Sequence, residues 1–154
     1  MSTGPHVLIV EARFYPDIAD ELLKGAVQAL EKQGATHERL SVPGAFEIPA
    51  AIAMTLEAHR RAPPHRDFDG YLALGCVIRG ETTHYDYVCG ESARALMHLA
   101  TQQQVALGYG ILTVENGEQA WERARVNKKN KGAGAAEACL AMIAYRRQLG
   151  LRAR

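Results

Sequence analysis

The sequence contains few aromatic residues, few cysteines and no long hydrophobic run. Aromatic residues make up 6% of its 154 residues, so the core must be built from aliphatic side chains. Its three cysteines, Cys76, Cys89 and Cys139, have no Cys-x-x-Cys spacing, which argues against a disulfide framework or a zinc site. We therefore expect buried thiols in a reducing cytoplasm.

Membrane and nucleic-acid partners are also disfavoured. No apolar stretch approaches the ~20 residues that a membrane-spanning helix needs, and the N-terminus lacks the pattern of a signal peptide. The formal net charge is only +1, whereas a dedicated nucleic-acid binder is usually basic. We expect no membrane and no nucleic acid among the partners.

Length and composition indicate one globular domain that spans residues 1–154. The chain is 47% hydrophobic and 23% charged, which excludes a disordered chain. We expect a short N-terminal arm at 1–5 and a basic, frayed C-terminal tail at about 146–154. A domain with a radius of gyration of roughly 15 Å leaves little room for a pocket that encloses two substrates.

Apolar runs and helical periodicities alternate along the chain. We expect Asp17 to cap the first helix and Gly34 to end it, and we expect a capping box at Asn116 and Gln119. The polar segment 58–70, with Pro63 and Pro64, indicates a surface connection. The predicted strands are 6–12, 36–42, 71–78 and 107–114, and the predicted helices are 17–33, 47–60, 86–103, 116–124 and 132–149.

This alternation predicts an α/β three-layer sandwich, with a central four-stranded parallel sheet flanked by helices on both faces. Ligands of such sheets bind outside the carboxyl ends of the strands, near the point where the strand order reverses. That rule selects the loops 12–16, 42–47, 79–86 and 114–117 as candidate binding loops.

Two of these loops offer contacts for a polar heterocycle. The aromatic residues of the first loop, Phe14 and Tyr15, form either a platform for a planar ring or a hydrophobic staple against the next helix. Glu47 stands at the start of a helix, where it either caps that helix or accepts hydrogen bonds from ligand hydroxyls.

The third loop has the composition of an anion site with a proton carrier. Gly80, two threonine hydroxyls and several backbone N–H groups precede a predicted helix N-terminus, which favours a phosphate. His84 lies in the same segment, and the ordinary pKa of imidazole suits proton transfer at neutral pH. A surface histidine is the alternative, which the phosphate-like context disfavours.

A basic stretch follows the short helix near residue 120. One or two of its cations could bind phosphate, while the others form a solvated face; spacing alone does not separate Arg123, Arg125, Lys128, Lys129 and Lys131. The glycines form neither a Walker loop nor a dinucleotide fingerprint. No His, Cys or carboxylate cluster has metal-ligand spacing, so no metal is expected.

Taken together, these motifs resemble one family, the 6,7-dimethyl-8-ribityllumazine synthases. The resemblance runs in colinear order from about Val7 to Tyr145, through the loops already selected above. It is carried by Arg13-Phe14, Val-Pro-Gly-Ala-Phe-Glu-Ile-Pro at 42–49, Gly-Cys-Val-Ile-Arg-Gly-Glu-Thr-Thr-His-Tyr-Asp at 75–86, Gly-Ile-Leu-Thr-Val-Glu-Asn at 110–116 and Asn-Lys-Gly at 130–132.

The resemblance implies the penultimate step of riboflavin biosynthesis. In that reaction, 5-amino-6-(D-ribitylamino)uracil condenses with 3,4-dihydroxy-2-butanone 4-phosphate to give the lumazine, phosphate and water. The imine nitrogen comes from the substrate, so the reaction needs no cofactor, metal or enzyme lysine nucleophile. Much of the rate should come from holding the two reactants together.

The resemblance also implies a role for each matching residue. Phe14 would stack on the pyrimidine, Glu47 would bind ribityl hydroxyls, and His84 would move protons. Arg123 and Lys131 would bind phosphate, and Tyr109, where many relatives have Phe, would pack on the ring. The pocket would lie between adjacent subunits, with these three residues facing the loops of a neighbour. Further contacts would come from Ala45 and Phe46 near the ribityl chain, Val77 and Ile78 at the pyrimidine edge, and Gly80, Glu81, Thr82 and Thr83 around the phosphate-bearing substrate.

The family resemblance further implies a homo-oligomer with a pentamer as its basic unit. Relatives that form icosahedral shells often carry a Gly-rich segment where this chain has 125–129, and the N-terminus here is short. Two other function classes stay open at this stage, namely a flavin- or lumazine-binding module without catalysis and a purely structural protein.

Overall fold

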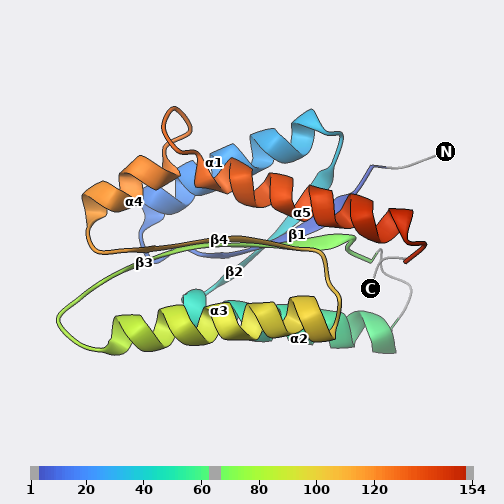
Figure 1. Cartoon of the computed structure of the whole chain (residues 1–154), viewed down its shortest axis with the longest axis horizontal. Helices are drawn as coiled ribbons and strands as arrows, with labels where there is room; N and C mark the ends of the chain where they lie inside the picture. The colour runs from blue at the N-terminus through green and yellow to red at the C-terminus, as the bar shows by residue number, and fades with distance from the viewer. Residues whose placement is uncertain (1–3, 63–66, 152–154) are drawn as a thin grey trace.

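A parallel sheet of four strands forms the middle layer of the protein (Figure 1). The structure is a computed structural model that describes residues 4–62 and 67–151. The strands lie in the order β2-β1-β3-β4. Their bounds are β1 (His6–Ala12), β2 (Thr36–Val42), β3 (Gly70–Ile78) and β4 (Leu107–Val114), which match the predicted strands closely.

Helices cover both faces of this sheet, as Figure 1 shows. One face carries α1 (Pro16–Lys32), α4 (Gly117–Ala124) and α5 (Lys131–Gln148). The other face carries α2 (Ile48–Arg61), which follows a short 3-10 turn η1 (Ala45–Glu47), and α3 (His84–Gln102). The predicted three-layer α/β sandwich is confirmed. Within the described ranges, none of the helices is both long and apolar enough to cross a membrane.

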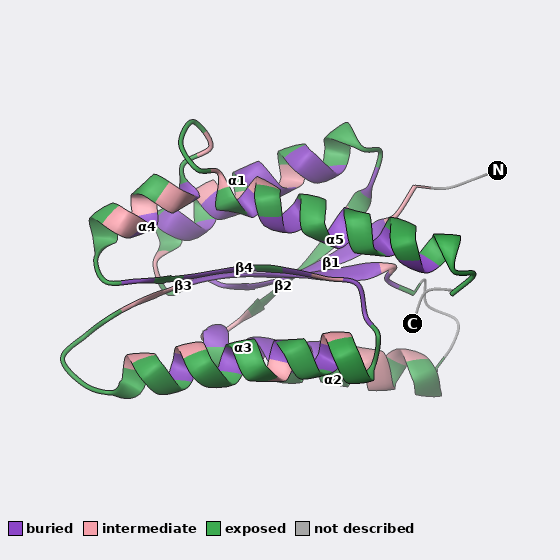
Figure 2. Ribbon diagram, viewed as in Figure 1, coloured by how far each residue is buried: buried purple, intermediate pink, exposed green. Residues whose placement is uncertain are grey.

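The two central strands are buried on both faces, which fixes their carboxyl ends (Figure 2). Alternate residues of β1 enter different cores: Val7 and Ile9 pack with α1 and α5, whereas Leu8 and Val10 pack with the α2 and α3 side. β2 is an edge strand and is largely exposed. The aliphatic core expected from the composition is confirmed.

The strand order places a topological switch between β1 and β3. These strands are adjacent, yet the chain leaves β1 toward α1 on one face and leaves β3 toward α3 on the other. Diverging connections leave a crevice outside the carboxyl ends of two such strands. The sheet therefore opens where the first and third predicted binding loops lie.

Two predicted helix starts are wrong. Tyr15, not Asp17, is the N-cap residue of α1, because Pro16 already occupies the first turn, where its missing N–H removes no hydrogen bond. α3 begins at His84, two residues before the predicted start. The predicted end of α1 is confirmed: Gly34 has φ of +73° just beyond the helix.

The predicted capping box at Asn116 is confirmed with one variation. The Asn116 side chain accepts a hydrogen bond from the Gln119 N–H at 2.9 Å. The Gln119 side chain in turn accepts from the N–H of Glu115, one residue before the cap, at 2.8 Å. This exchange satisfies two N–H groups at the start of α4.

The predicted C-terminal tail starts too early. α5 continues to Gln148, Arg146 is buried, and Arg147 pairs with Asp69 at 3.4 Å. The side chains of Arg146 and Arg147 therefore contact the protein at the end of α5 and do not form a frayed tail. The remaining predictions for residues 1–3, the Pro63–Pro64 segment within 63–66, and 152–154 lie outside the described residues.

Helices α1 and α5 approach so closely that a glycine is required between them. A Cβ at Gly132 would lie 2.1 Å from the carbonyl oxygen of Leu22 in α1, well inside van der Waals contact. At Gly134, two residues later on the exposed side of α5, a Cβ would meet nothing within 4 Å.

We therefore expect Gly132→Ala to lower the free energy of unfolding by about 1–3 kcal/mol, because α1 and α5 must separate. Gly134→Ala is the matched control and should stabilise by up to about 1 kcal/mol through helix propensity. Urea unfolding at equal protein concentrations measures both variants. Equal stability of the two variants would contradict this close packing.

All three cysteines are free, and Cys76 and Cys139 are buried. Burial raises the pKa of Cys76 to about 11 and that of Cys139 to about 12. A raised pKa in the folded state favours folding below pH 9, and this contribution is lost as the pH rises toward those values.

We expect iodoacetamide at about pH 8 to spare Cys76 and Cys139 in the folded protein, since the thiolate is the reactive form. In urea, all three cysteines should react at similar rates. Peptide mass spectrometry locates the label, and the half-buried Cys89 serves as the internal comparison. Rapid labelling of Cys139 in the folded protein would refute its burial.

Candidate active site

A cavity of about 620 Å³ opens at the carboxyl ends of β1 and β3, within the size range of small-molecule sites. We call it the His84 cavity. It brings together most of the predicted site residues, from loops far apart in the sequence. Those residues are Phe14, Ala45, Phe46, Glu47, Val77, Ile78, Gly80, Thr82 and His84.

Phe14 presents its ring to the cavity rather than to the protein core. Its side chain is 72% exposed, so the hydrophobic-staple interpretation does not hold for Phe14. Tyr15 packs instead against the apolar cluster beneath α1 and α4. The edge of one ring meets the face of the other, with centroids 5.0 Å apart and planes at 75°. A flat, exposed aromatic face is thus available for stacking.

Glu47 ends the 3-10 turn and stands directly before α2. Glu47 occupies the N-cap position of α2, as the capping interpretation has it, but its side chain makes no hydrogen bond to the helix. Its carboxylate lies beside Gly44, where a Cβ would come within 3.3 Å of Oε1. The carboxylate therefore has acceptor capacity for ligand hydroxyls.

His84 is the first residue of α3 and is exposed. Its backbone N–H donates to the Thr82 hydroxyl at 3.3 Å, and its imidazole makes no hydrogen bond with other described residues. The ring is therefore available to a ligand, next to N–H groups of the first turn of a long helix. Such a terminus favours an anion.

Arg79 precedes this turn but is already engaged by protein groups. Its Nε donates to Glu115 at 2.7 Å, a second nitrogen lies 3.5 Å from Asp86, and its guanidinium sits 4.3 Å from the centre of the Tyr85 ring. The hydrogen bond to Glu115 is the chief reason why the pKa of Arg79 is raised. No lysine or arginine is among the described residues that line the His84 cavity.

The remaining predicted cations line a second, separate cavity of about 590 Å³ between β4, α4 and α5. We call it the Arg123 cavity, and it contains Tyr109, Arg123 and Lys131. One guanidinium nitrogen of Arg123 donates to the Gln119 carbonyl at 3.1 Å. Burial is the main cause of the raised pKa of Tyr109. One chain therefore does not bring these residues to His84.

The loop before Lys131 is held in a defined shape. Asn130 has φ of +48°, a left-handed conformation, immediately before the start of α5. The Glu21 carboxylate of α1 accepts a hydrogen bond from the backbone N–H of Val126 at 3.0 Å. These contacts fix the segment that joins Arg123 to Lys131.

Two predicted site residues, Glu81 and Thr83, are exposed and line neither cavity. Sequence reasoning missed Tyr87 and Val88, which line the His84 cavity one helical turn after His84. A predicted helix that started at His84 would have identified them, because residues three and four positions later lie on the same helix face. Cys76, in β3, also lines the cavity. The remaining lining residues belong to the loops selected from the sequence, namely Ala12, Tyr15, Pro43, Gly44 and Tyr85.

The side chains of the His84 cavity suit binding and proton transfer rather than thiol chemistry. With its pKa raised to about 11 by burial, Cys76 is a neutral thiol near pH 7. Across residues 4–62 and 67–151, no group of three or more His, Cys, Asp or Glu side chains could hold a metal ion. An exposed imidazole, a carboxylate and an aromatic face remain as the functional groups.

Comparison with known proteins gives one consistent result. The family model for 6,7-dimethyl-8-ribityllumazine synthase matches residues 4–147. The chain is 57% identical to the 6,7-dimethyl-8-ribityllumazine synthase of Bartonella tribocorum over 150 residues, which cover 97% of this chain and 95% of that protein. It is 57% identical to the synthase of the same name from Agrobacterium fabrum over 146 residues, with 95% and 97% covered.

A third relative, the synthase of that name from Methylorubrum populi, is 58% identical over 148 residues, which cover 96% of this chain and 86% of that protein. These matches extend over nearly the whole chain, as the resemblance of the motifs did. The chain belongs to the 6,7-dimethyl-8-ribityllumazine synthase family, a family of transferases, which confirms the prediction from its motifs.

Proposed function

We propose that this chain condenses 5-amino-6-(D-ribitylamino)uracil with 3,4-dihydroxy-2-butanone 4-phosphate to form 6,7-dimethyl-8-ribityllumazine, phosphate and water. The observation that carries the proposal is the His84 cavity, in which a stacking ring, a carboxylate and an imidazole from three loops face one space. Membership of the family supports the identity of the substrates. Each chain contributes one domain, and three free thiols suit a reducing cytoplasm.

The aminouracil occupies the apolar half of the His84 cavity. Its pyrimidine stacks on the exposed face of Phe14, with Val77 and Ile78 at the ring edge. The ribityl hydroxyls donate to Glu47, beside Ala45 and Phe46. This placement uses the carboxylate of Glu47, which the described part of the lining provides, for the partner with the most hydroxyl donors.

The phosphorylated ketone lies at the start of α3. The substrate amine attacks the ketone and forms an imine with loss of water, phosphate leaves, and the enol tautomerises before the ring closes with loss of a second water. His84, whose imidazole is not engaged by described residues, moves protons in these steps. Gly80 and Thr82 surround this substrate at the cavity wall, and Glu81 and Thr83 lie on the adjoining surface.

The site is completed by a second copy of the chain. A phosphate ester needs cationic partners, yet the described lining of the His84 cavity contains none, whereas Arg123 and Lys131 line the other cavity. Phe46, Tyr87 and Tyr109 also stay 43–68% exposed in the single chain, as interface residues do. We infer a homo-oligomer in which Tyr109, Arg123 and Lys131 face the neighbour's His84 cavity, with the pentamer as its basic unit.

The activity is tested by mixing the purified protein with both substrates and following lumazine absorbance against the uncatalysed condensation. We expect clear acceleration by the wild type. His84→Ala should lower kcat by about 10²- to 10⁴-fold, while KM for the aminouracil changes little, because proton transfer acts in the transition state.

His98→Ala, at an exposed position of the same helix outside the cavity, is the matched control and should behave like the wild type. Tight lumazine binding without turnover would favour a binding module over a synthase. Equal kcat for His84→Ala and wild type would refute the proton-transfer role.

Arg123→Ala tests the phosphate assignment. We expect KM for the phosphorylated ketone to rise at least about tenfold, because a charge-assisted hydrogen bond is lost, with a smaller change for the aminouracil. Lys128→Ala, in the same basic segment but on the exposed surface, should leave both KM values unchanged. If only the KM for the aminouracil changes, Arg123 does not belong to the phosphate site.

A further inference from the structure

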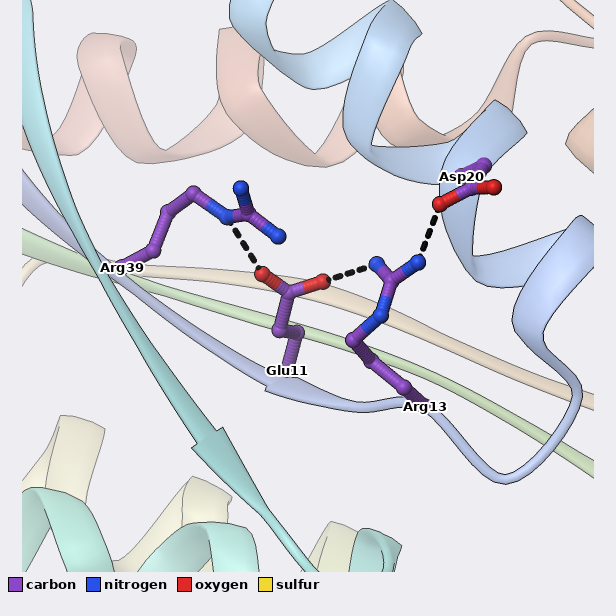
Figure 3. A network of polar contacts seen from close by, with 4 residues as sticks. All are labelled: Glu11, Arg13, Asp20 and Arg39. Carbon is purple, nitrogen blue, oxygen red and sulfur yellow. Dashed lines mark hydrogen bonds and ion pairs between the residues drawn. The ribbon is translucent and has the colours of Figure 1, made fainter.

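A buried carboxylate lies at the carboxyl end of β1, beside the His84 cavity but on the opposite face of the sheet. Glu11 is only 1% exposed, the least accessible acidic side chain among the buried residues described. Figure 3 shows it between two guanidinium groups. Oε1 accepts a hydrogen bond from Arg13 at 2.6 Å, and Oε2 accepts one from Nε of Arg39 at 2.7 Å. Burying an unpaired carboxylate is costly, so these partners are required.

The two arginines differ in what they connect. Arg39 lies on the edge strand β2 and is about half exposed, so it is the member of the network on the solvent side of Glu11. Arg13 lies in the turn that follows β1, and its second terminal nitrogen pairs with Asp20 in the second turn of α1. The hydrogen bond to Glu11, then that to Asp20, raises the pKa of Arg13. Arg13 therefore ties the turn both to the strand before it and to the helix after it.

The same turn carries Phe14. Side chains alternate at the end of β1: Glu11 and Arg13 join the network on the α1 side, whereas Ala12 and Phe14 line the His84 cavity on the other side. Phe14 cannot be fixed by burial, because it is 72% exposed and its described ring contact is Tyr15. Its position must come from the backbone on either side, where Pro16 restricts one end.

We propose that Glu11 is a positioning residue for substrate binding: its carboxylate holds Arg13, and Arg13 sets the backbone turn that presents Phe14 to the pyrimidine ring. Neither residue touches the reacting atoms. The inference rests on the proposed function, since it takes Phe14 as the stacking partner of the aminouracil. It assigns to a buried ion network a role in substrate affinity as well as stability.

The kinetic test compares the ion pair of Glu11 with Arg13 and the ion pair of Glu11 with Arg39. Glu11→Gln and Arg13→Lys both weaken the link to the turn, because lysine lacks the fork that spans two carboxylates. We expect each to raise KM for the aminouracil by about three- to tenfold, the size of a lost stacking contact, with kcat and KM for the phosphorylated ketone within about twofold. Arg39→Gln removes a partner of the same carboxylate but not the link to the turn, and should leave all three parameters unchanged.

A second pair of variants avoids the buried position. Asp20 is exposed, so Asp20→Asn should fold normally and still raise KM for the aminouracil. Asp17→Asn is its control: it removes an acidic charge from the first turn of the same helix, whereas the ion pair with Arg13 belongs to Asp20. A double-mutant cycle adds that Glu11→Gln should have no further effect on KM once Phe14 is alanine.

Hydrogen exchange at the backbone amides of residues 13–15 measures how well the turn is held, and it requires no activity assay. We expect faster exchange in Glu11→Gln and Asp20→Asn, and wild-type exchange in Arg39→Gln and Asp17→Asn. Unchanged exchange, or additive effects of Glu11→Gln and Phe14→Ala on KM, would overturn the proposal. An inactive wild type with the expected exchange pattern would instead contradict the proposed function and the pyrimidine assignment, while leaving the control of the turn standing.

Discussion

The charge of a phosphate ester is the constraint on which the arrangement of this site depends. A dianion needs cations or many N–H donors at short range. The His84 cavity offers a helix N-terminus and an imidazole, but also the carboxylate of Glu47, and no lysine or arginine appears in its described lining. The two cations suited to phosphate face a different cavity of the same chain. In the proposed function, the two cavities therefore meet across an interface between two copies of the chain.

The fold supplies this arrangement through the sheet. β1 and β3 are buried on both faces, so the loops at their carboxyl ends start from fixed points. The loop after β1 is short and tied by Arg13, whereas the chain after β3 enters a long helix at His84. In the proposed function, the sheet presents Phe14 and His84 to one cavity. This placement suits a condensation that we expect to gain much of its rate from proximity.

Much of this architecture is predictable from the sequence because it follows from periodicity. Apolar runs marked the two central strands, whereas the polar edge strand β2 was predicted on a weaker pattern. The switch-point rule selected three of the loops that line the His84 cavity. The start of α3 was misplaced because His84 has a polar side chain and no apolar periodicity marks the first turn. The network of Glu11 was not foreseen, since an acidic residue within an apolar strand shows neither its depth nor its partners. The separation of Arg123 from His84 is a tertiary fact that no local pattern contains.

The central claim is that each working site takes His84 from one chain and Arg123 from its neighbour. It is tested most directly by co-expressing His84→Ala and Arg123→Ala chains with different tags and assaying the purified mixed oligomer at a ketone concentration well below the wild-type KM, where each variant alone is slow. In a ring with random order, about a quarter of the interfaces pair an intact His84 with an intact Arg123, so about a quarter of wild-type activity should return. Activity no higher than that of either variant alone would contradict the shared site.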